Sequence, residues 1–345
     1  MQKRDFWFII KSFLIWRVAI TLIAYFAILY IPRFSDNFFG GRLLNYEANP
    51  LLWGWANFDG EHYLSIAING YKDLQQAYFP FYPLLIRLFG GSVVAATLIS
   101  NISFLVAIVG LYKLIRLDYS EKTAKLAIIL LLIFPTSFFF ATVYTESLFL
   151  ALVVWSFFLF RKQKYFSGLV LGTLSSLTRA IGIIPLGLFS YMTYSKYRWG
   201  DYLAFFHNQT YFGEHRSSQI ILLPQVFYRY AAKIIPNLAW SYPPAVFTTL
   251  LEFGIALLFL IVILFSFKRI RLEYWLFLAF GYLLPTLSGS FSSLPRYVVV
   301  LFPAFIYIAT RFKDIKKSFL IVGLFITSLI AIVAEMMFIR GYFVS

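Results

Sequence analysis

Long apolar segments separated by short basic connections dominate the chain. Several of them reach the ~20 apolar residues that a helix needs to cross the hydrocarbon core of a bilayer. The pattern predicts spanning helices at about 13–31, 92–112, 124–142, 144–161, 247–267, 272–287, 297–310 and 318–339. Residues 165–195 instead indicate two short helices that meet near 178–182. Because the short alternating segments of a membrane barrel are missing, the expected fold class is all-α.

Basic residues mark one end of these helices. They gather in short connections, at 3–4, 113–125, 161–164, 268–271 and 311–317. Short cytoplasmic loops retain positive charge in this way. We therefore expect residues 1–345 to form a single polytopic transmembrane domain with about nine or ten spans. Its long first extracytoplasmic loop is expected at 32–83.

The pattern of apolar segments and basic connections does not decide on which side of the membrane residues 196–246 lie. A return to the inside at Lys196 and a helix that starts outside near Pro243 require one more crossing. Residues 202–242 contain Arg216, Arg229 and Lys233 and make a poor spanning segment. A broken helix or a re-entrant segment shielded by protein is the alternative.

Composition excludes several classes of protein. The chain has 345 residues, 61% of them hydrophobic, and a formal net charge of +15. Because the basic residues lie in short connections, no basic face is left to follow a phosphate backbone, and we expect no nucleic-acid partner. The absence of cysteine excludes disulfides and thiolate metal sites. The three histidines show no pair at ligand spacing, so no metal site is expected. The apolar N-terminal stretch is expected to be an uncleaved first helix.

The first outer loop carries the most informative cluster of ionisable residues. Asp59, Glu61 and His62 stand within four positions, in a chain where only 13% of residues are charged. A short helix is expected from Asp59 to about Asn69, ending near Gly70. Acids among aromatic residues at a membrane face suggest chemistry on an amphipathic substrate. The alternative for Asp59 is a solvated or helix-capping acid.

Three further ionisable residues are expected on the same outer face. Ionisable groups at membrane-embedded segments are costly and usually mark a pathway or a site. Glu146 is either a site residue or a favourable acid at a helix N-terminus. Arg179 lies between two apolar runs and is either functional or structural. Arg296 follows Pro295 at a predicted helix start, where a cation opposes the helix dipole, which indicates a distant anionic partner.

This combination suits the transfer of a sugar from a phosphate carrier. A carboxylate base is needed to deprotonate the attacking hydroxyl. Cationic groups are needed to hold the departing phosphate, and the planar fork of arginine binds phosphate oxygens bidentately. The segment from Tyr78 to Tyr82, beside the acids, is a candidate lining for an isoprenoid or a sugar.

A series of short motifs resembles the PIG-V type of mannosyltransferase, within the GT-C superfamily of polytopic glycosyltransferases. In order, they are FDGEHYLSIA at 58–67 with GY at 70–71, AYFPFYP at 77–83, FPTS at 134–137 with YTESLF at 144–149, LTRAIG at 177–182, DYLAFFHNQ at 201–209 and PRY at 295–297. The chain departs from the family pattern at Phe58, where tryptophan is usual, and at Phe134, where asparagine is common. Neither change removes a charge.

The resemblance implies an inverting transfer of a sugar, typically mannose, from a polyprenyl-phosphate donor on the non-cytoplasmic face. It assigns the catalytic acid to Asp59. Arg179 and Arg296 would hold the phosphate, while Glu61, His62 and Glu146 would shape the acceptor side. No cofactor is expected beyond the donor itself.

The expected partners are membrane lipid and an acceptor that is a glycan, a glycolipid or a protein. The expected location is the cell membrane in a prokaryote or the endoplasmic reticulum in a eukaryote. Two alternatives stay open: a transporter or flippase of lipid-linked sugars, and a non-catalytic membrane partner of a glycosyltransferase.

Overall fold

The computed structural model describes residues 2–34, 39–72, 74–208 and 220–344. Asp36, Asp73, Gln209 and Arg216, which belong to the loop and the segment considered above, lie outside these ranges. Every regular element within them is a helix, and the described chain contains no strand. The expected all-α fold class is therefore confirmed.

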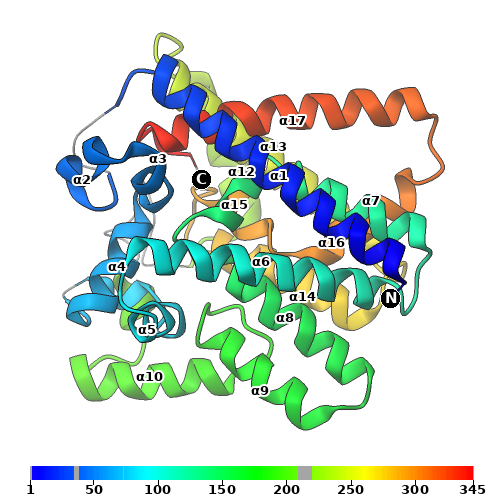
Figure 1. The fold of residues 1–345 in the computed structure, drawn as a ribbon, viewed down its shortest axis with the longest axis horizontal. Coiled ribbons are helices and arrows are strands. Elements are labelled where there is room, and N and C mark those ends of the chain that lie inside the picture. The colour runs from blue at the N-terminus through cyan, green and yellow to red at the C-terminus, as the bar shows by residue number, and fades with distance from the viewer. Residues whose placement is uncertain (1, 35–38, 73, 209–219, 345) are drawn as a thin grey trace.

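The chain is built from long helices and from groups of short helices that connect them (Figure 1). The first part of the chain contains α1 (Lys3–Tyr30), α2 (Arg42–Ala48), α3 (Pro50–Trp53), α4 (Asp59–Asn69), α5 (Phe81–Leu88), α6 (Val93–Ile115), α7 (Glu121–Leu132), the 3-10 helix η3 (Ser137–Ala141), α8 (Glu146–Arg161), α9 (Tyr165–Ser176) and α10 (Leu186–Trp199). The remainder contains α11 (Ala204–His207), α12 (Leu223–Arg229), a π-helical turn (Tyr230–Ile234), α13 (Pro243–Ser266), α14 (Leu272–Thr286), α15 (Leu294–Val298), α16 (Phe302–Phe312) and α17 (Lys317–Ile339).

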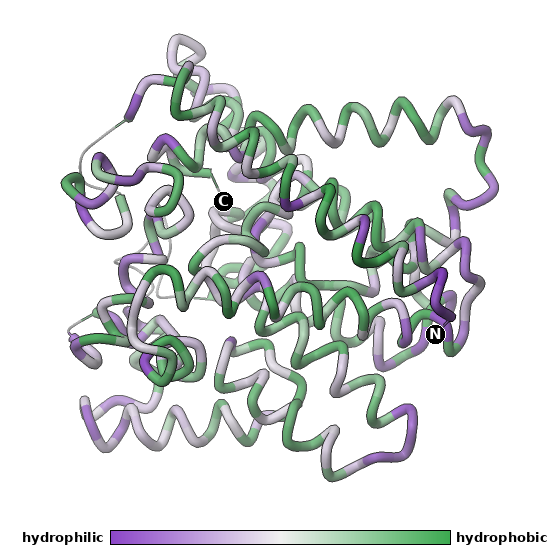
Figure 2. The backbone as a smooth tube through the Cα atoms, viewed as in Figure 1, coloured by the Kyte–Doolittle hydropathy of each residue, from purple (hydrophilic) through white to green (hydrophobic). Residues whose placement is uncertain are grey.

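Four of the described helices, α1, α6, α13 and α17, are long and apolar enough to cross a membrane. Figure 2 shows their apolar middles and the hydrophilic connections at the end of the bundle that holds the N-terminus. The predicted polytopic helical membrane protein is confirmed.

Ion pairs hold the basic connections together at one end of the bundle. Arg4 at the start of α1 pairs with Glu121 at the start of α7, at 2.9 Å. Asp118, between α6 and α7, pairs with Arg161 at the end of α8, at 2.6 Å, and lies 3.8 Å from Arg271, between α13 and α14. The short helices α2 to α5 lie at the opposite end (Figure 1).

Two of the expected spanning helices are interrupted at proline. The prediction of a helix over 124–142 is wrong for the second half of that range, because α7 ends at Leu132 and only a 3-10 turn follows. Pro135 stands in the gap, where it has no N–H to donate to a continuing helix. The helix expected over 297–310 is likewise divided into α15 and α16, and Pro303 lies in the first turn of α16, after Phe302.

The expectation that Lys196 returns to the basic end is also wrong. Trp199, at the end of α10, packs edge-on against Tyr71 with ring centroids 5.5 Å apart, so α10 ends beside α4 and α5. Tyr242, just before α13, lies 6.2 Å from Phe34, which follows α1. The described parts of 200–242 therefore begin and end at the α2–α5 end, and the extra crossing is unnecessary.

The α2–α5 end is tied firmly to the bundle. The Tyr82 side chain in α5 is fully buried, and its hydroxyl lies 2.9 Å from Ser100 Oγ and donates to the Ala96 carbonyl at 3.1 Å, both on α6. The Tyr191 hydroxyl of α10 donates to the Gln76 carbonyl at 2.7 Å. These contacts fix the segment 76–82 between α6 and α10.

Candidate active site

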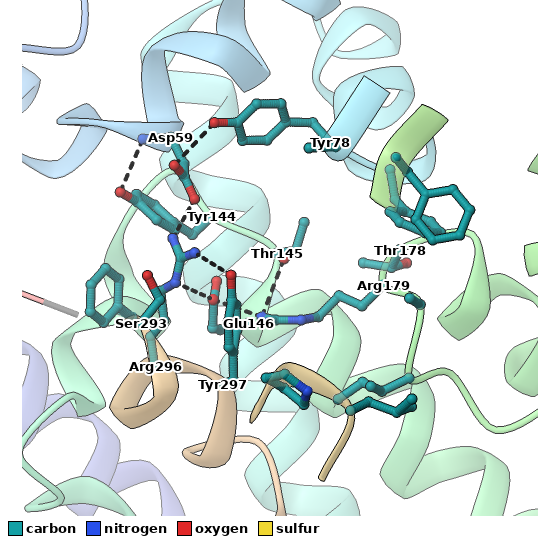
Figure 3. A pocket seen from close by; sticks show the side chains of 18 of the residues that line it. Asp59, Tyr78, Tyr144, Thr145, Glu146, Thr178, Arg179, Ser293, Arg296 and Tyr297 are labelled. Atoms are coloured by element: carbon teal, nitrogen blue, oxygen red, sulfur yellow. Dashed lines mark hydrogen bonds and ion pairs between the residues drawn. The ribbon is translucent and has the colours of Figure 1, made fainter. Parts of the chain in front are cut away.

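A cavity of about 400 Å³ opens at the α2–α5 end of the bundle. This volume lies within the usual range for pockets that bind small molecules. Figure 3 shows polar side chains that converge on it from several helices. The polar lining residues are Asp59, Tyr63, Tyr78, Tyr144, Thr145, Glu146, Thr178, Arg179, Ser288, Ser293, Arg296 and Tyr297.

Asp59 is positioned by an unusual stretch of backbone. Phe58, directly before it, has φ 56°, a left-handed conformation that is strained for a bulky residue. The flanking groups hold it there: Asn57 Nδ2 donates to the Phe338 carbonyl at 2.9 Å, and the Tyr144 hydroxyl donates to the Asn57 carbonyl at 2.9 Å. The Asp59 N–H in turn donates to the Tyr144 hydroxyl at 3.2 Å. The predicted short helix then begins at Asp59 and ends at Asn69, as expected.

Both carboxylate oxygens of Asp59 have partners. The Tyr78 hydroxyl donates to Oδ1 at 3.1 Å, and the Arg296 guanidinium donates to Oδ2 (Figure 3). Burial alone would raise the pKa of the Asp59 carboxyl, but Arg296, with smaller contributions from His62 and Tyr78, holds that pKa below its ordinary value. Asp59 is therefore ionised at neutral pH.

Glu146 and Arg179 extend this pair into a chain of alternating charges. Arg179 Nη1 donates to Glu146 Oε1 at 2.7 Å, and Arg296 Nε lies 3.7 Å from the same oxygen. The Glu146 side chain is 1% exposed, and each arginine side chain is 11% exposed. The order Asp59, Arg296, Glu146, Arg179 thus places two carboxylates beside two guanidinium groups, the arrangement that buried charges require.

Arg179 reaches the cavity because a helix is broken there. The chain leaves α9 after Ser176 and enters α10 at Leu186, which confirms the predicted pair of short helices. A Cβ on Gly182 would lie 2.2 Å from the Ser176 backbone, so only glycine lets the connection fold back on α9. Arg179 stands in this connection and points toward Glu146 (Figure 3).

Aromatic rings cover the faces of both arginines. The Arg296 guanidinium lies 5.1 Å from the ring centroids of Tyr144 and Tyr297, and Arg179 lies 5.1 Å from that of Tyr297. Such contacts favour a cation in a poorly hydrated site. The motifs at 144–149 and 295–297 contain Tyr144 and Tyr297, but reasoning from the sequence named neither as a site residue.

Glu61 and His62 stand apart from the other expected site residues. Neither lines the cavity among the described residues. The His62 ring stacks on the Tyr78 ring with centroids 4.7 Å apart, and its Nδ1 lies 3.4 Å from Gln75 Nε2. His62 thus supports the residue that contacts Asp59. The described part of the chain holds no group of three acidic, histidine or cysteine side chains arranged to bind a metal ion.

The fold and the cavity define a polytopic membrane protein whose buried site combines acids with arginines, the groups suited to phosphate-linked substrates. Comparison with family models makes this specific: residues 8–212 match Mannosyltransferase (PIG-V). The chain belongs to this family and is a membrane glycosyltransferase of the mannosyltransferase type. No significant match is found to a curated protein or to a solved structure. The matched range includes Asp59, Tyr78, Glu146 and Arg179, whereas Arg296 follows it and is brought to the site by the fold.

Proposed function

We propose that the protein transfers mannose from a polyprenyl-phosphate donor to an acceptor hydroxyl, on the membrane face that carries α2 to α5. The observation that supports this most strongly is that two acid–arginine pairs line one cavity. Asp59 is paired with Arg296, and Glu146 is paired with Arg179. The basic connections at the opposite end favour a cytoplasmic position for that end, which leaves the cavity outside.

In the proposed reaction Asp59 acts as the general base. The acceptor hydroxyl gives its proton to an Asp59 oxygen while the acceptor oxygen bonds to the anomeric carbon. The bond from that carbon to the phosphate oxygen breaks, and the polyprenyl phosphate leaves with the bonding electrons. This single displacement inverts the anomeric configuration. Arg179 and Arg296 stabilise the charge that develops on the phosphate, as preorganised cations do in a poorly hydrated site.

The resting site must rearrange before this chemistry begins. Asp59 Oδ2 accepts from Arg296, and Oδ1 accepts from Tyr78. The donor phosphate competes with the carboxylates for the two guanidinium groups. Once the donor phosphate binds Arg296, Asp59 Oδ2 is free to accept the proton of the acceptor hydroxyl, while the Tyr78 hydroxyl still donates to Oδ1. In this mechanism the donor binds first and produces the active base.

The assay that tests the proposal measures transfer of radiolabelled mannose from mannosyl polyprenyl phosphate. The purified protein is placed in liposomes with a lipid extract as the source of acceptor. Wild type is expected to transfer the label and to invert the anomeric configuration. Arg296→Gln is expected to lose roughly 10²- to 10³-fold in rate.

Arg87→Gln is the matched control for Arg296→Gln. It removes the same charge from an exposed position in α5 that lies outside the cavity. Its rate is expected to stay close to that of wild type. Absence of transfer by folded wild type, or a product of retained configuration, contradicts the proposal.

A further inference from the structure

The wall of the cavity that carries Arg296 is built from an irregular connection and a very short helix. Residues 287–293 join α14 to α15 without helical structure, and α15 itself has five residues. Ser293, which lines the cavity directly before α15, has φ 65°, in the left-handed region (Figure 3). So short a helix is not stable on its own. The place of Arg296 therefore depends on the contacts that hold the connection 287–293.

The segment that contains α12 lies against the first part of this connection. The Ile221 N–H donates to the Leu287 carbonyl at 3.0 Å, and Arg229 Nη1 donates to the Gly289 carbonyl at 3.1 Å. A Cβ on Gly289 would lie 2.5 Å from the Ile221 side chain, so glycine permits this close approach. These contacts fix the backbone as it leaves α14.

Tyr230 holds the second part of the connection. Its hydroxyl accepts from the Phe291 N–H at 3.1 Å and donates to Glu252 Oε2 at 2.9 Å. The Tyr230 and Phe291 rings also pack together, with centroids 4.7 Å apart. One hydroxyl thus joins the backbone of the connection to Glu252 of α13, and α13 itself packs against α15.

The chemistry of this contact exceeds what packing requires. Tyr230 and Glu252 are 4% and 5% exposed, and neither is among the described residues that line the cavity. A buried carboxylate is costly unless it accepts hydrogen bonds, and here it fixes the orientation of the Tyr230 hydroxyl. Tyr230 also begins the π-helical turn, a rare element that frequently occurs at functional sites. Both residues follow the range matched by the family model.

We infer that Tyr230 is a positioning residue for Arg296, an inference that rests on the proposed function. With its hydroxyl oriented by Glu252, Tyr230 holds the Phe291 backbone five residues before Arg296. In the proposed reaction the Arg296 guanidinium passes from Asp59 to the donor phosphate. A fixed backbone lets the side chain alone make that exchange, and small displacements of a positioned group lower the rate strongly.

A double-mutant cycle tests whether Tyr230 acts through Arg296. Tyr230→Phe removes the hydroxyl and keeps the ring, and it is expected to lower kcat/KM for mannose transfer by about tenfold. In the Arg296→Gln background the same change is expected to lower kcat/KM by less than about twofold, because the group that it positions is gone. A structural role that does not involve Arg296 would lower both backgrounds by the same factor.

Tyr282→Phe is the matched control. The Tyr282 side chain is fully buried in α14, and its hydroxyl donates to the Ala256 carbonyl of the same helix α13 at 2.9 Å. The substitution therefore removes an equivalent hydroxyl without touching the connection. Its kcat/KM is expected to stay close to that of wild type.

Hydrogen–deuterium exchange of the Phe291 amide gives a readout that needs no turnover. Exchange is expected to be about tenfold faster or more in Tyr230→Phe than in wild type and in Tyr282→Phe, because this amide loses its acceptor. Unchanged exchange, equal losses of kcat/KM in the two backgrounds, or an equal loss in Tyr282→Phe overturns the inference. Absence of transfer by folded wild type overturns the proposed function instead, and the exchange comparison still decides whether Tyr230 holds the connection.

Discussion

Replacing Asp59 by asparagine removes the proposed base and the counter-ion of Arg296 together, and the two losses are expected to change turnover and binding in opposite directions. Loss of a general base lowers turnover by roughly 10²- to 10⁴-fold. The same substitution is expected to tighten the binding of polyprenyl phosphate, the leaving group of the proposed reaction. In wild type this phosphate must displace Asp59 from Arg296, whereas in Asp59→Asn it meets a guanidinium that no longer has its closest carboxylate.

The size of the gain follows from the environment of the pair. The Asp59 side chain is 26% exposed and that of Arg296 is 11% exposed, so the interaction is screened less than one at the surface and more than one in a dry interior. An interaction of about 1–2 kcal/mol corresponds to roughly 5- to 30-fold in affinity. Glu146, 3.7 Å from Arg296 Nε, still offsets part of the charge, so the variant is expected to fold.

The measurement is a binding titration of polyprenyl phosphate in detergent against wild type, Asp59→Asn and Glu61→Gln. Glu61 lies two residues from Asp59 but outside the cavity lining, so its substitution gives the same change in net charge without freeing Arg296. Uncharged polyprenol reports on the contribution of the tail alone. Equal or weaker binding by Asp59→Asn than by Glu61→Gln would refute the competition between carboxylate and phosphate.

Three other predictions concern the same site and the course of the chain. Tyr78→Phe removes the hydrogen bond to Asp59 Oδ1 and should lower kcat by roughly tenfold with little change in donor affinity, as steady-state kinetics would show. Arg296 lowers the pKa of Asp59 in the resting enzyme, so kcat/KM should fall only as the pH drops below the ordinary aspartate value of 3.8. The acid limb of kcat should lie at higher pH, because Asp59 has lost its pairing with Arg296 in the donor-bound enzyme. Coincident acid limbs in the two pH profiles would contradict this. Tyr197→Cys, 89% exposed on α10 in a chain without cysteine, should react with an impermeant maleimide from the same side as Leu44→Cys and from the side opposite to Lys164→Cys.

The sequence predicted the four long apolar helices and four ionisable residues that meet in the cavity, because each prediction depends on a local signal. Apolar periodicity located the long helices, and the short helix at Asp59 was predicted with its observed bounds. The expectation that Asp59, Glu146, Arg179 and Arg296 share one face agrees with their meeting in one cavity. Their proposed roles remain predictions.

The rest depends on contacts between distant segments, which no local pattern contains. The positive charge of Lys196 predicts a position at the basic end of the bundle. The contact of Trp199 with Tyr71 instead places the end of α10 beside α4 and α5. Tyr82, in a motif considered as a substrate lining, is instead fully buried against α6. The pairing of each acid with an arginine also required the fold, because Asp59 and Arg296 lie 237 positions apart.

The alternating charges of the resting cavity have a consequence for selectivity among the anions that surround the protein. Two acids and two arginines leave the cluster with no net charge, so a free phosphate ion or a phospholipid headgroup must break existing ion pairs to bind and gains little in exchange. A ligand that also places a long hydrocarbon tail in lipid has a second source of affinity to offset that loss. If the proposed function is correct, the empty enzyme resists inhibition by common inorganic anions while still accepting the lipid-linked donor.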